Sequence, residues 1–329
     1  MGAVLSKLVE PVSKADNDRW LGSISPIKGE LRAAMVGVAA GAFFHESRFG
    51  LKWEREQLMI PLQRWWSSAA VSQLMHTLSL FADELMVPYF AVLYWCLDKF
   101  KCVYGIWLVP ISEIVNGCMK WYFAVPRPGW VDSRVQMRGW SHEYSFPSSH
   151  SQIIWALATF FSGTSVGMLR EKLYGSAGTT MLAYWWFLLG PPTFAALVSI
   201  SRVHEGVHYP RDISVGCGIG VGLASVYMRF LPAIRAFMKR RHPAVRYALL
   251  QSLSLVAARA CNYYYGVAQR KGDDPSKWCA TAIAGNPTKW AGKDLNPLDT
   301  PMSGYKGCVP RRGSLRALLT SRQAGRLTG

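Results

Sequence analysis

Three clusters of polar residues have the composition of a site that handles phosphate. They are Lys120 with Arg127-Pro128, the run Pro147-Ser148-Ser149-His150, and Ser201-Arg202 with His208 and Asp212. Lysine and arginine stabilise charge on phosphoryl oxygens, while hydroxyls and free helix N–H groups bind anions. Histidine serves as a nucleophile or as a general acid. If the clusters meet in space, they predict phosphoryl-transfer chemistry.

Each cluster is expected at the end of a helix. Lys120 and Arg127 are separated by close to two helical turns, so they are predicted to project from one side of a helix that the following proline ends. Pro147 is predicted at the first helical position, with the serines in the first turn. If Pro210 starts the next helix, Asp212 can reach back to His208, fix its tautomer and raise its basicity.

The elements that position these clusters are long uncharged segments. Residues 147–169, 173–201 and 213–228 contain no Asp, Glu, Lys or Arg, and a membrane-spanning helix needs about 20 mostly apolar residues. The predicted spans are 31–46, 80–97, 102–123, 147–169, 181–201 and 212–231, with a doubtful seventh at 244–266. Because successive spans alternate in direction, the end of the third and the starts of the fourth and sixth lie on one side of the bilayer, where the clusters converge.

The expected fold class is therefore all-α, a polytopic membrane helix bundle of about six spans with a disordered basic C-terminal tail. The predicted division is a cytosolic N-terminal segment (1–30), a membrane phosphatase core (31–232), a basic linker with a possible extra membrane helix (233–266) and a basic tail of low order (267–329). Trp53 to Ser68 is typical of an amphipathic helix at the membrane interface. The glycines at 216, 218, 220 and 222 permit close helix packing.

The clusters resemble the K-x6-RP, PSGH and SR-x5-H-x3-D motifs of the type 2 phosphatidic acid phosphatase and vanadium haloperoxidase superfamily. The resemblance covers roughly residues 50–232. It implies that His208 is the nucleophile that forms a phosphohistidine, that Asp212 orients it and that His150 is the general acid. The implied phosphate-binding residues are Lys120, Arg127, Ser148, Arg202 and, through its backbone N–H, Ser149. Ser149 departs from the family pattern, which has glycine there. No metal and no cofactor are implied.

The resemblance narrows the substrate to a lipid phosphate. The stretch Glu143 to His150 is similar to long-chain-base phosphate phosphatases, whereas Pro147 to Gln152 is similar to dolichyl diphosphatases. The expected substrate is a phosphate monoester, either a sphingoid-base phosphate or phosphatidate. The alternatives are a polyprenyl (dolichyl) diphosphate and a catalytically silent, lipid-binding membrane protein.

Three other activities fit parts of the sequence less well. His204 to His208 satisfies the H-E-x-x-H pattern of zinc proteases, but Gly206 and Pro210 disfavour one helix through both histidines. A vanadate-dependent peroxidase would use the same residues in a soluble protein. A transporter would be expected to have paired broken helices, for which Pro191-Pro192 is the one candidate.

The charge of the chain predicts its partners and its orientation. The net charge is +17, but the basic residues flank apolar segments, which favours a bilayer and a lipid phosphate as partners over nucleic acid. Loops opposite the clusters contain Lys99, Lys101, Arg170 and Lys172, so these loops are predicted to be cytosolic and the site lumenal, in the endoplasmic reticulum. The N-terminus is then cytosolic, where Gly2 fits the pattern for N-myristoylation. The seven cysteines show no metal-binding spacing.

Overall fold

The described part of the chain consists of helices joined by loops. The computed structural model describes residues 48–81, 102, 104–139, 143–173, 179–240 and 281–286, together with 242, 244–245, 248–249, 251–253, 255–256, 258–260 and 263. No strand occurs in these ranges. In chain order the elements are α4 (Arg48–Trp53), the π-helix η1 (Glu54–Met59), α5 (Ile60–Trp65), α6 (Ala69–Leu80), α9 (Leu108–Phe123), α10 (Pro128–Val131), α11 (Ser149–Leu173), α12 (Thr179–His204) and α13 (Pro210–Arg240).

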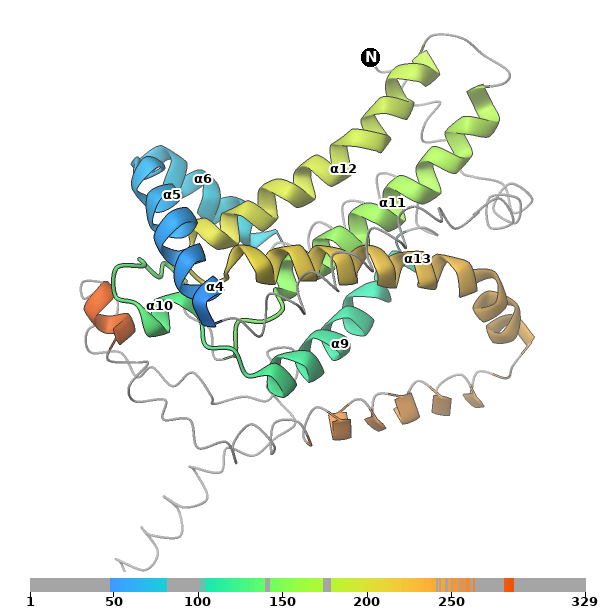
Figure 1. The fold of residues 1–329 in the computed structure, drawn as a ribbon. Helices are drawn as coiled ribbons and strands as arrows, with labels where there is room; N and C mark the ends of the chain where they lie inside the picture. The colour runs from blue at the N-terminus through green and yellow to red at the C-terminus, as the bar shows by residue number, and fades with distance from the viewer. Residues whose placement is uncertain are drawn as a thin grey trace, which may run out of the picture.

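The centre of the fold is α11, which packs against both α12 and α13, while α9 packs against α11 and α13 (Figure 1). Two glycines of α13 allow its backbone to approach α11. A Cβ atom at Gly216 would lie 2.6 Å from the carbonyl oxygen of Ser148, and one at Gly220 would lie 2.2 Å from that of Gln152. The predicted role of the α13 glycines in close helix packing is confirmed at these two positions.

A buried polar network fixes α9 against the start of α11. Asn116 Nδ2 donates to Gln152 Oε1 at 3.0 Å and to the carbonyl oxygen of Pro147 at 3.2 Å. Gln152 Nε2 donates in turn to Ser112 Oγ at 2.9 Å. Because buried polar groups need partners of fixed geometry, this network sets the register between the helix that carries Lys120 and the segment that carries the second cluster.

The helices α4, η1 and α5 follow one another directly and lie across one end of the bundle, beside the start of α13 (Figure 1). Met59 and Ile60 are buried, whereas Trp53 and Trp65 are exposed on the outer side. The predicted helix is confirmed from Trp53 as far as Trp65, and its position at the membrane interface stays a prediction. Its last three residues instead lead into α6, where Ser68 Oγ accepts from the N–H of Val71 at 3.3 Å.

The helices α12 and α13 cover the predicted segments 181–201 and 212–231, α11 covers 147–169 except for its first two residues, and α9 covers most of 102–123. Within the described ranges, one helix, Pro210–Phe237, is both long and apolar enough to cross a bilayer. The segments 31–46 and nearly all of 80–97 lie outside the described residues, as do large parts of 244–266 and of the tail. The number of spans therefore stays a prediction.

One detail of the predicted helices is wrong. Pro147 precedes α11, which begins at Ser149, so Pro147 is not the first helical residue. Ser148 instead accepts a hydrogen bond on Oγ from the N–H of Ser151 at 3.4 Å, as a residue before a helix does. Pro191 and Pro192 lie inside α12, which continues through them, so the broken helix that a transporter would need is not present at that position.

Candidate active site

The first cluster is divided between a helix and the loop that follows it. The helix α9 ends at Phe123, and Ala124 adopts a left-handed conformation with φ of 50°. Arg127 lies beyond this turn, directly before α10. The prediction that Lys120 and Arg127 project from one helix is therefore wrong, because the helix ends too early. Both side chains nevertheless meet at Glu143: Lys120 Nζ lies 2.5 Å from its Oε2 and Arg127 Nε lies 2.7 Å from its carbonyl oxygen.

Arg127 is buried and held at several donor atoms. Its Nη1 donates to the carbonyl oxygen of Val207 at 2.9 Å, and its Nη2 to that of Tyr144 at 3.4 Å. The same Nη1 lies 3.3 Å from His208 Nε2. Burial lowers the pKa of Arg127 to about 10, opposed by the nearby charge of Glu143, so the guanidinium remains charged at neutral pH. It is a fixed cation beside the imidazole.

The third cluster forms where α12 gives way to α13. The helix α12 ends at His204, and Gly206 has a φ of 72°, at a place where a Cβ would lie 2.5 Å from the carbonyl oxygen of Gln136. The chain then turns, and Pro210 is the first residue of α13, as predicted. Asp212 consequently lies in the first turn of α13, facing back toward the loop.

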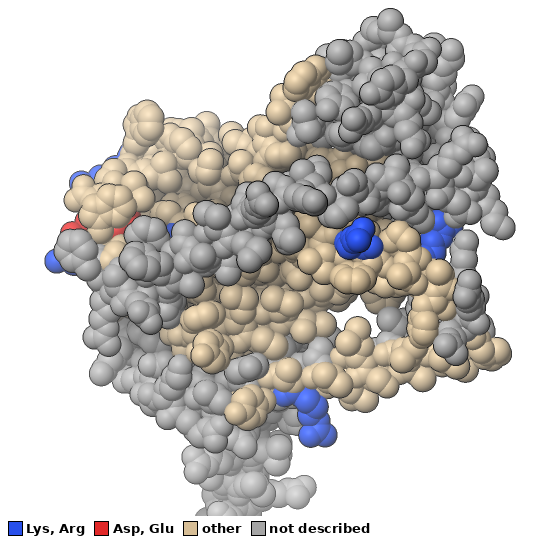
Figure 2. Space-filling view, turned by 45° about the vertical axis from the view of Figure 1, so that its right-hand side comes forward, with Lys and Arg blue, Asp and Glu red and all other residues tan. Residues whose placement is uncertain are grey.

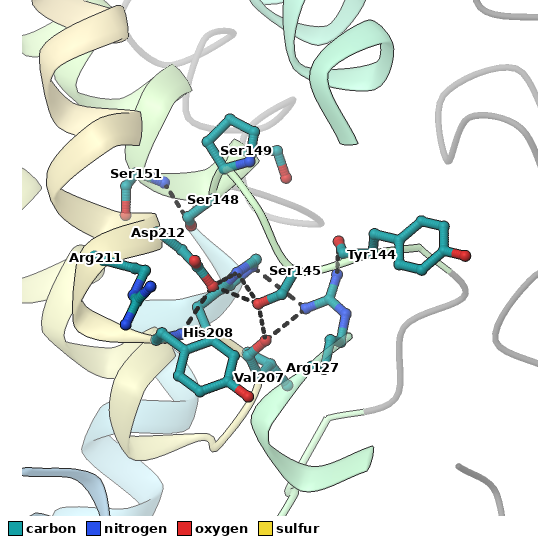
Figure 3. Close-up of polar contacts among 12 residues, drawn as sticks. Arg127, Tyr144, Ser145, Ser148, Ser149, Ser151, Val207, His208, Arg211 and Asp212 are labelled. Atoms are coloured by element: carbon teal, nitrogen blue, oxygen red, sulfur yellow. Dashed lines mark hydrogen bonds and ion pairs between the residues drawn. The ribbon is translucent and has the colours of Figure 1, made fainter. Parts of the chain in front are cut away.

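One carboxylate oxygen of Asp212 gathers three groups (Figure 3). Its Oδ2 accepts from the N–H of Tyr209 at 2.9 Å and from Ser145 Oγ, and it lies 3.5 Å from His208 Nδ1. Both His208 and Asp212 are almost fully buried. The acid is therefore placed to orient the imidazole, which is the arrangement expected from the sequence.

The neighbours of His208 define its tautomer. Arginine can only donate hydrogen bonds, so the Nε2 beside Arg127 must be the unprotonated ring nitrogen and the proton must be on Nδ1, facing Asp212. The pKa of His208 is well below its ordinary value. Burial is the largest cause, and the positive charges of Arg127, Arg202 and Lys120 act in the same direction. The ring is therefore neutral at neutral pH, with a lone pair on Nε2.

The second cluster is joined to the third through the backbone. The N–H of Ser148 donates to the carbonyl oxygen of Asp212 at 3.1 Å, which fixes the start of α11 against the start of α13. Ser149 Oγ lies 3.4 Å from Lys120 Nζ, so the serine at the position where the resembled motif has glycine contacts the first cluster. His150, the second residue of α11, contributes to the lowered pKa of His208, which places it within electrostatic range.

Arg202 enters from the last turn of α12. Its Nη1 donates to Ser79 Oγ on α6, and its positive charge lowers the pKa of His208. The predicted residues of all three clusters are thus brought to one end of the bundle. Two residues that contact them, Glu143 and Ser145, were given no role in the site from the sequence, although Ser145 opens the polar run that leads into α11. Their signal was modest: both are polar and stand directly before the second cluster.

One ion pair and one hydrogen bond connect the π-helix to this site. Arg211 Nε lies 3.0 Å from Glu54 Oε1, and both side chains are largely buried. Burial raises the pKa of Glu54, and the charge of Arg211 opposes this effect. Arg55 Nη1 donates to the hydroxyl of Tyr209 at 3.3 Å. The π-helix therefore holds the residues on either side of Pro210, next to the imidazole.

The zinc-protease pattern is not realised in space. His204 Nε2 lies 3.0 Å from the carbonyl oxygen of Trp66, whereas His208 faces Asp212 and Arg127. The helix ends at His204, so the two histidines do not share a helix face. In the ranges that the structure describes, no group of three or more His, Cys, Asp or Glu side chains could hold a metal ion.

Comparison with known proteins gives one family. Residues 102–236, which contain all three clusters, match the PAP2 superfamily. The chain is 33% identical over 112 residues to a dihydrosphingosine 1-phosphate phosphatase of Schizosaccharomyces pombe. The matched residues cover 33% of this chain and 25% of that protein, so the chain spans about a quarter of the relative's length. The crystal structure of a transmembrane PAP2-type phosphatidylglycerolphosphate phosphatase from Bacillus subtilis is similar with a TM-score of 0.48 and 16% identity, over 62% of this chain and 96% of that one. The match to the PAP2 superfamily covers the segment 102–236, which is less than half of the chain.

Proposed function

We propose that this chain is a membrane lipid phosphate phosphatase that works through a phosphohistidine on His208. The observation that carries the proposal is the placement of that imidazole. Its Nε2 lies 3.3 Å from Arg127 Nη1, and its Nδ1 lies 3.5 Å from Asp212 Oδ2. The unprotonated nitrogen therefore faces the cations, where a phosphoryl group would be bound, and the protonated nitrogen faces the acid.

The proposed reaction has two steps. In the first, His208 Nε2 attacks phosphorus, the bond to the ester oxygen breaks, and His150 gives a proton to the departing alcohol. In the second, His150 takes a proton from water, the water oxygen attacks phosphorus, and the N–P bond breaks to release inorganic phosphate. Asp212 stabilises the positive charge that the phosphorylated ring acquires. Lys120, Arg127 and Arg202 stabilise the negative charge on the phosphoryl oxygens.

The substrate class that we propose is a lipid phosphate monoester. The relative from Schizosaccharomyces pombe is a dihydrosphingosine 1-phosphate phosphatase, which supports a sphingoid-base phosphate over phosphatidate. The same attack on a polyprenyl diphosphate would expel a lipid monophosphate, so a polyprenyl diphosphate is the alternative substrate. The alternative to an enzyme is a catalytically silent, lipid-binding protein.

A bilayer position follows from the same proposal. The helix Pro210–Phe237 is long and apolar enough to span, and its apolar side chains Phe230 and Ile234 are exposed. Figure 2 shows a face whose described surface is mostly uncharged, with isolated Lys and Arg side chains. We place residues 31–232 in the membrane as about six spans, with a lumenal site, in the endoplasmic reticulum. The N-terminus, with Gly2 as a myristoylation acceptor, is then cytosolic.

The test uses the full chain purified in detergent. Release of inorganic phosphate is measured from a sphingoid-base phosphate, phosphatidate and a polyprenyl diphosphate, with EDTA or orthovanadate added. We expect hydrolysis that EDTA leaves unchanged and vanadate inhibits. His208→Ala should lower kcat by about 10³-fold or more and abolish the labelled phosphoenzyme trapped by alkaline denaturation. His242→Ala, an exposed histidine, is the matched control. Full activity in His208→Ala would refute the proposal.

A further inference from the structure

Glu143 holds both cations of the first cluster, although it belongs to none of the three clusters. Its carboxylate lies 2.5 Å from Lys120 Nζ, and its carbonyl oxygen accepts from Arg127 Nε at 2.7 Å. The next residue, Tyr144, accepts from Arg127 Nη2 with its own carbonyl oxygen. The position of both proposed phosphate ligands therefore depends on one short stretch of loop.

The pair between Lys120 and Glu143 is nearly closed to solvent. Lys120 is 2% exposed and Glu143 is 8% exposed. A buried charge is strongly destabilising when its partner is removed, so the carboxylate holds the ammonium in place. An ammonium has three donor hydrogens. Glu143 takes one and Ser149 Oγ, at 3.4 Å, is placed to take a second, which leaves a third for a phosphoryl oxygen.

We propose that Glu143 is a positioning residue that aims Lys120 at the bound phosphoryl group and, by its negative charge, limits how tightly the site holds phosphate. The inference rests on the proposed function, since it assigns Lys120 to phosphate. Two effects then separate. The carboxylate oxygen orients the ammonium, which affects turnover, and the carboxylate charge repels the phosphate dianion, which affects affinity and release of the product.

Two substitutions distinguish these effects. Glu143→Gln keeps an oxygen that can accept from Lys120 but removes the negative charge. Removing one unit charge a few ångströms from a bound dianion corresponds to roughly a tenfold change in affinity. We therefore expect the inhibition constants of inorganic phosphate and orthovanadate to fall about tenfold, with kcat changed by less than about threefold. Glu143→Ala removes the oxygen as well, and should lower kcat by roughly 10- to 100-fold.

The dependence on Lys120 is tested by a double-mutant cycle. In a Lys120→Met background no ammonium remains to be oriented, so Glu143→Ala should lower kcat by less than about twofold. Glu143→Gln should still lower the inhibition constants in that background, because the Glu143 charge acts on the phosphate directly. These double variants have no unpaired buried charge, so they also control for loss of folding. A merely structural role predicts the opposite pattern: a lower melting temperature with unchanged inhibition constants in both backgrounds.

The matched control is Glu56→Gln, which makes the same chemical change at an ion pair away from the three clusters. Glu56 pairs with Arg134 at 2.9 Å, and both side chains are substantially exposed. We expect no change in the inhibition constants. Binding of orthovanadate is also followed by the thermal shift of the purified chain, which does not require turnover. If the wild type neither hydrolyses lipid phosphates nor binds vanadate, the proposed function fails. If it does both and Glu143→Gln leaves the constants unchanged, the inference about Glu143 alone is overturned.

Discussion

At the scale of residues, a single carboxylate oxygen connects two segments of the site. Asp212 Oδ2 accepts from the backbone N–H of Tyr209 and from Ser145 Oγ, and it faces His208 Nδ1. These groups come from the loop before α13 and from the segment before α11. The orientation of the proposed nucleophile is therefore not set by the acid alone. It also depends on the hydroxyl that keeps the acid in its place.

Ser145→Ala tests that dependence. The substitution removes a hydrogen bond to a carboxylate, worth about 1.5–3 kcal/mol, and the buried oxygen regains no water. We expect kcat to fall by roughly 10- to 100-fold with little change in KM, measured by phosphate release. The control is Ser214→Ala, where the exposed hydroxyl only donates to the carbonyl oxygen of Pro210 at 3.0 Å. Equal activity in both variants would contradict the assigned role.

The pH dependence of the reaction reports the charge around His208. Attack requires the neutral ring, so activity is lost as the pH falls through the pKa of His208. Burial and the nearby cations, Arg202 among them, lower that pKa. The acidic limb of the kcat/KM profile is therefore expected below the ordinary histidine pKa of about 6.5. Arg202→Gln removes a cation, so the pKa rises and the limb moves to higher pH.

The control for this shift is Arg138→Gln. The charge of Arg138 acts on His204 and is not among the charges that lower the pKa of His208. A rate–pH profile of the two variants, measured on one soluble phosphate ester, should show a moved limb for Arg202→Gln alone. An acidic limb that stays in place in Arg202→Gln would contradict the electrostatic account, whatever happens to the overall rate.

The sequence was sufficient to select the residues that meet, but not all their partners. His208 and Asp212 are four residues apart on the chain, and the proline between them predicts where the helix starts, so their contact could be foreseen. Ser145 and Glu143 could not be found in this way. Their contacts with Asp212 and Lys120 join distant segments, and only the packing of α9, α11 and α13 brings these segments together.

At the scale of elements, the uncharged segments predicted helices well and their ends less well. The helices α11, α12 and α13 follow from absence of charge over long stretches. The end of α9 could not be predicted in this way. Ala124 ends the helix in the left-handed conformation, which glycine or asparagine usually adopts at helix ends. The loop that follows α9 is held by a residue from another part of the chain, because the N–H of Ser145 donates to the carbonyl oxygen of Val125 at 2.8 Å.

Gly220→Ala tests the contact between α11 and α13. The added methyl would lie 2.2 Å from the carbonyl oxygen of Gln152, and backbone cannot give way locally, so the helices must separate. Overpacking of this kind costs about 1–3 kcal/mol, and we expect the melting temperature in detergent to fall by several degrees, roughly 2–4 °C per kcal/mol.

The control for this contact is Gly163→Ala on α11. Its added methyl would meet the flexible end of Met228, with the sulfur at 3.3 Å, and that side chain can move aside. A melting temperature in Gly220→Ala that equals the value in Gly163→Ala would show that the close approach of the two helices is not needed for stability.

At the scale of the whole molecule, the three clusters, the π-helix and its ion pairs all lie at one end of the helix bundle, the end at which α9 finishes and α11 and α13 begin (Figure 1). In the proposed bilayer arrangement that end faces the lumen, and the loop between α11 and α12 faces the cytosol. Asn-linked glycosylation distinguishes the two sides, because acceptor sites are modified only in the lumen. The chain has no acceptor of its own, since Asn286 is followed by proline.

Two single substitutions each create one acceptor. Gly139→Asn places asparagine two residues before Ser141 on the site side. A Cβ atom added at Gly139 would lie at ordinary distances of 3.9 and 4.0 Å from its nearest atoms. Tyr174→Asn places asparagine two residues before Ser176 in the loop on the other side. In microsomes we expect a glycosidase-sensitive mass increase for Gly139→Asn alone. Modification of Tyr174→Asn instead would reverse the orientation, placing the site in the cytosol and removing the argument that the basic loops determine the orientation of the bundle.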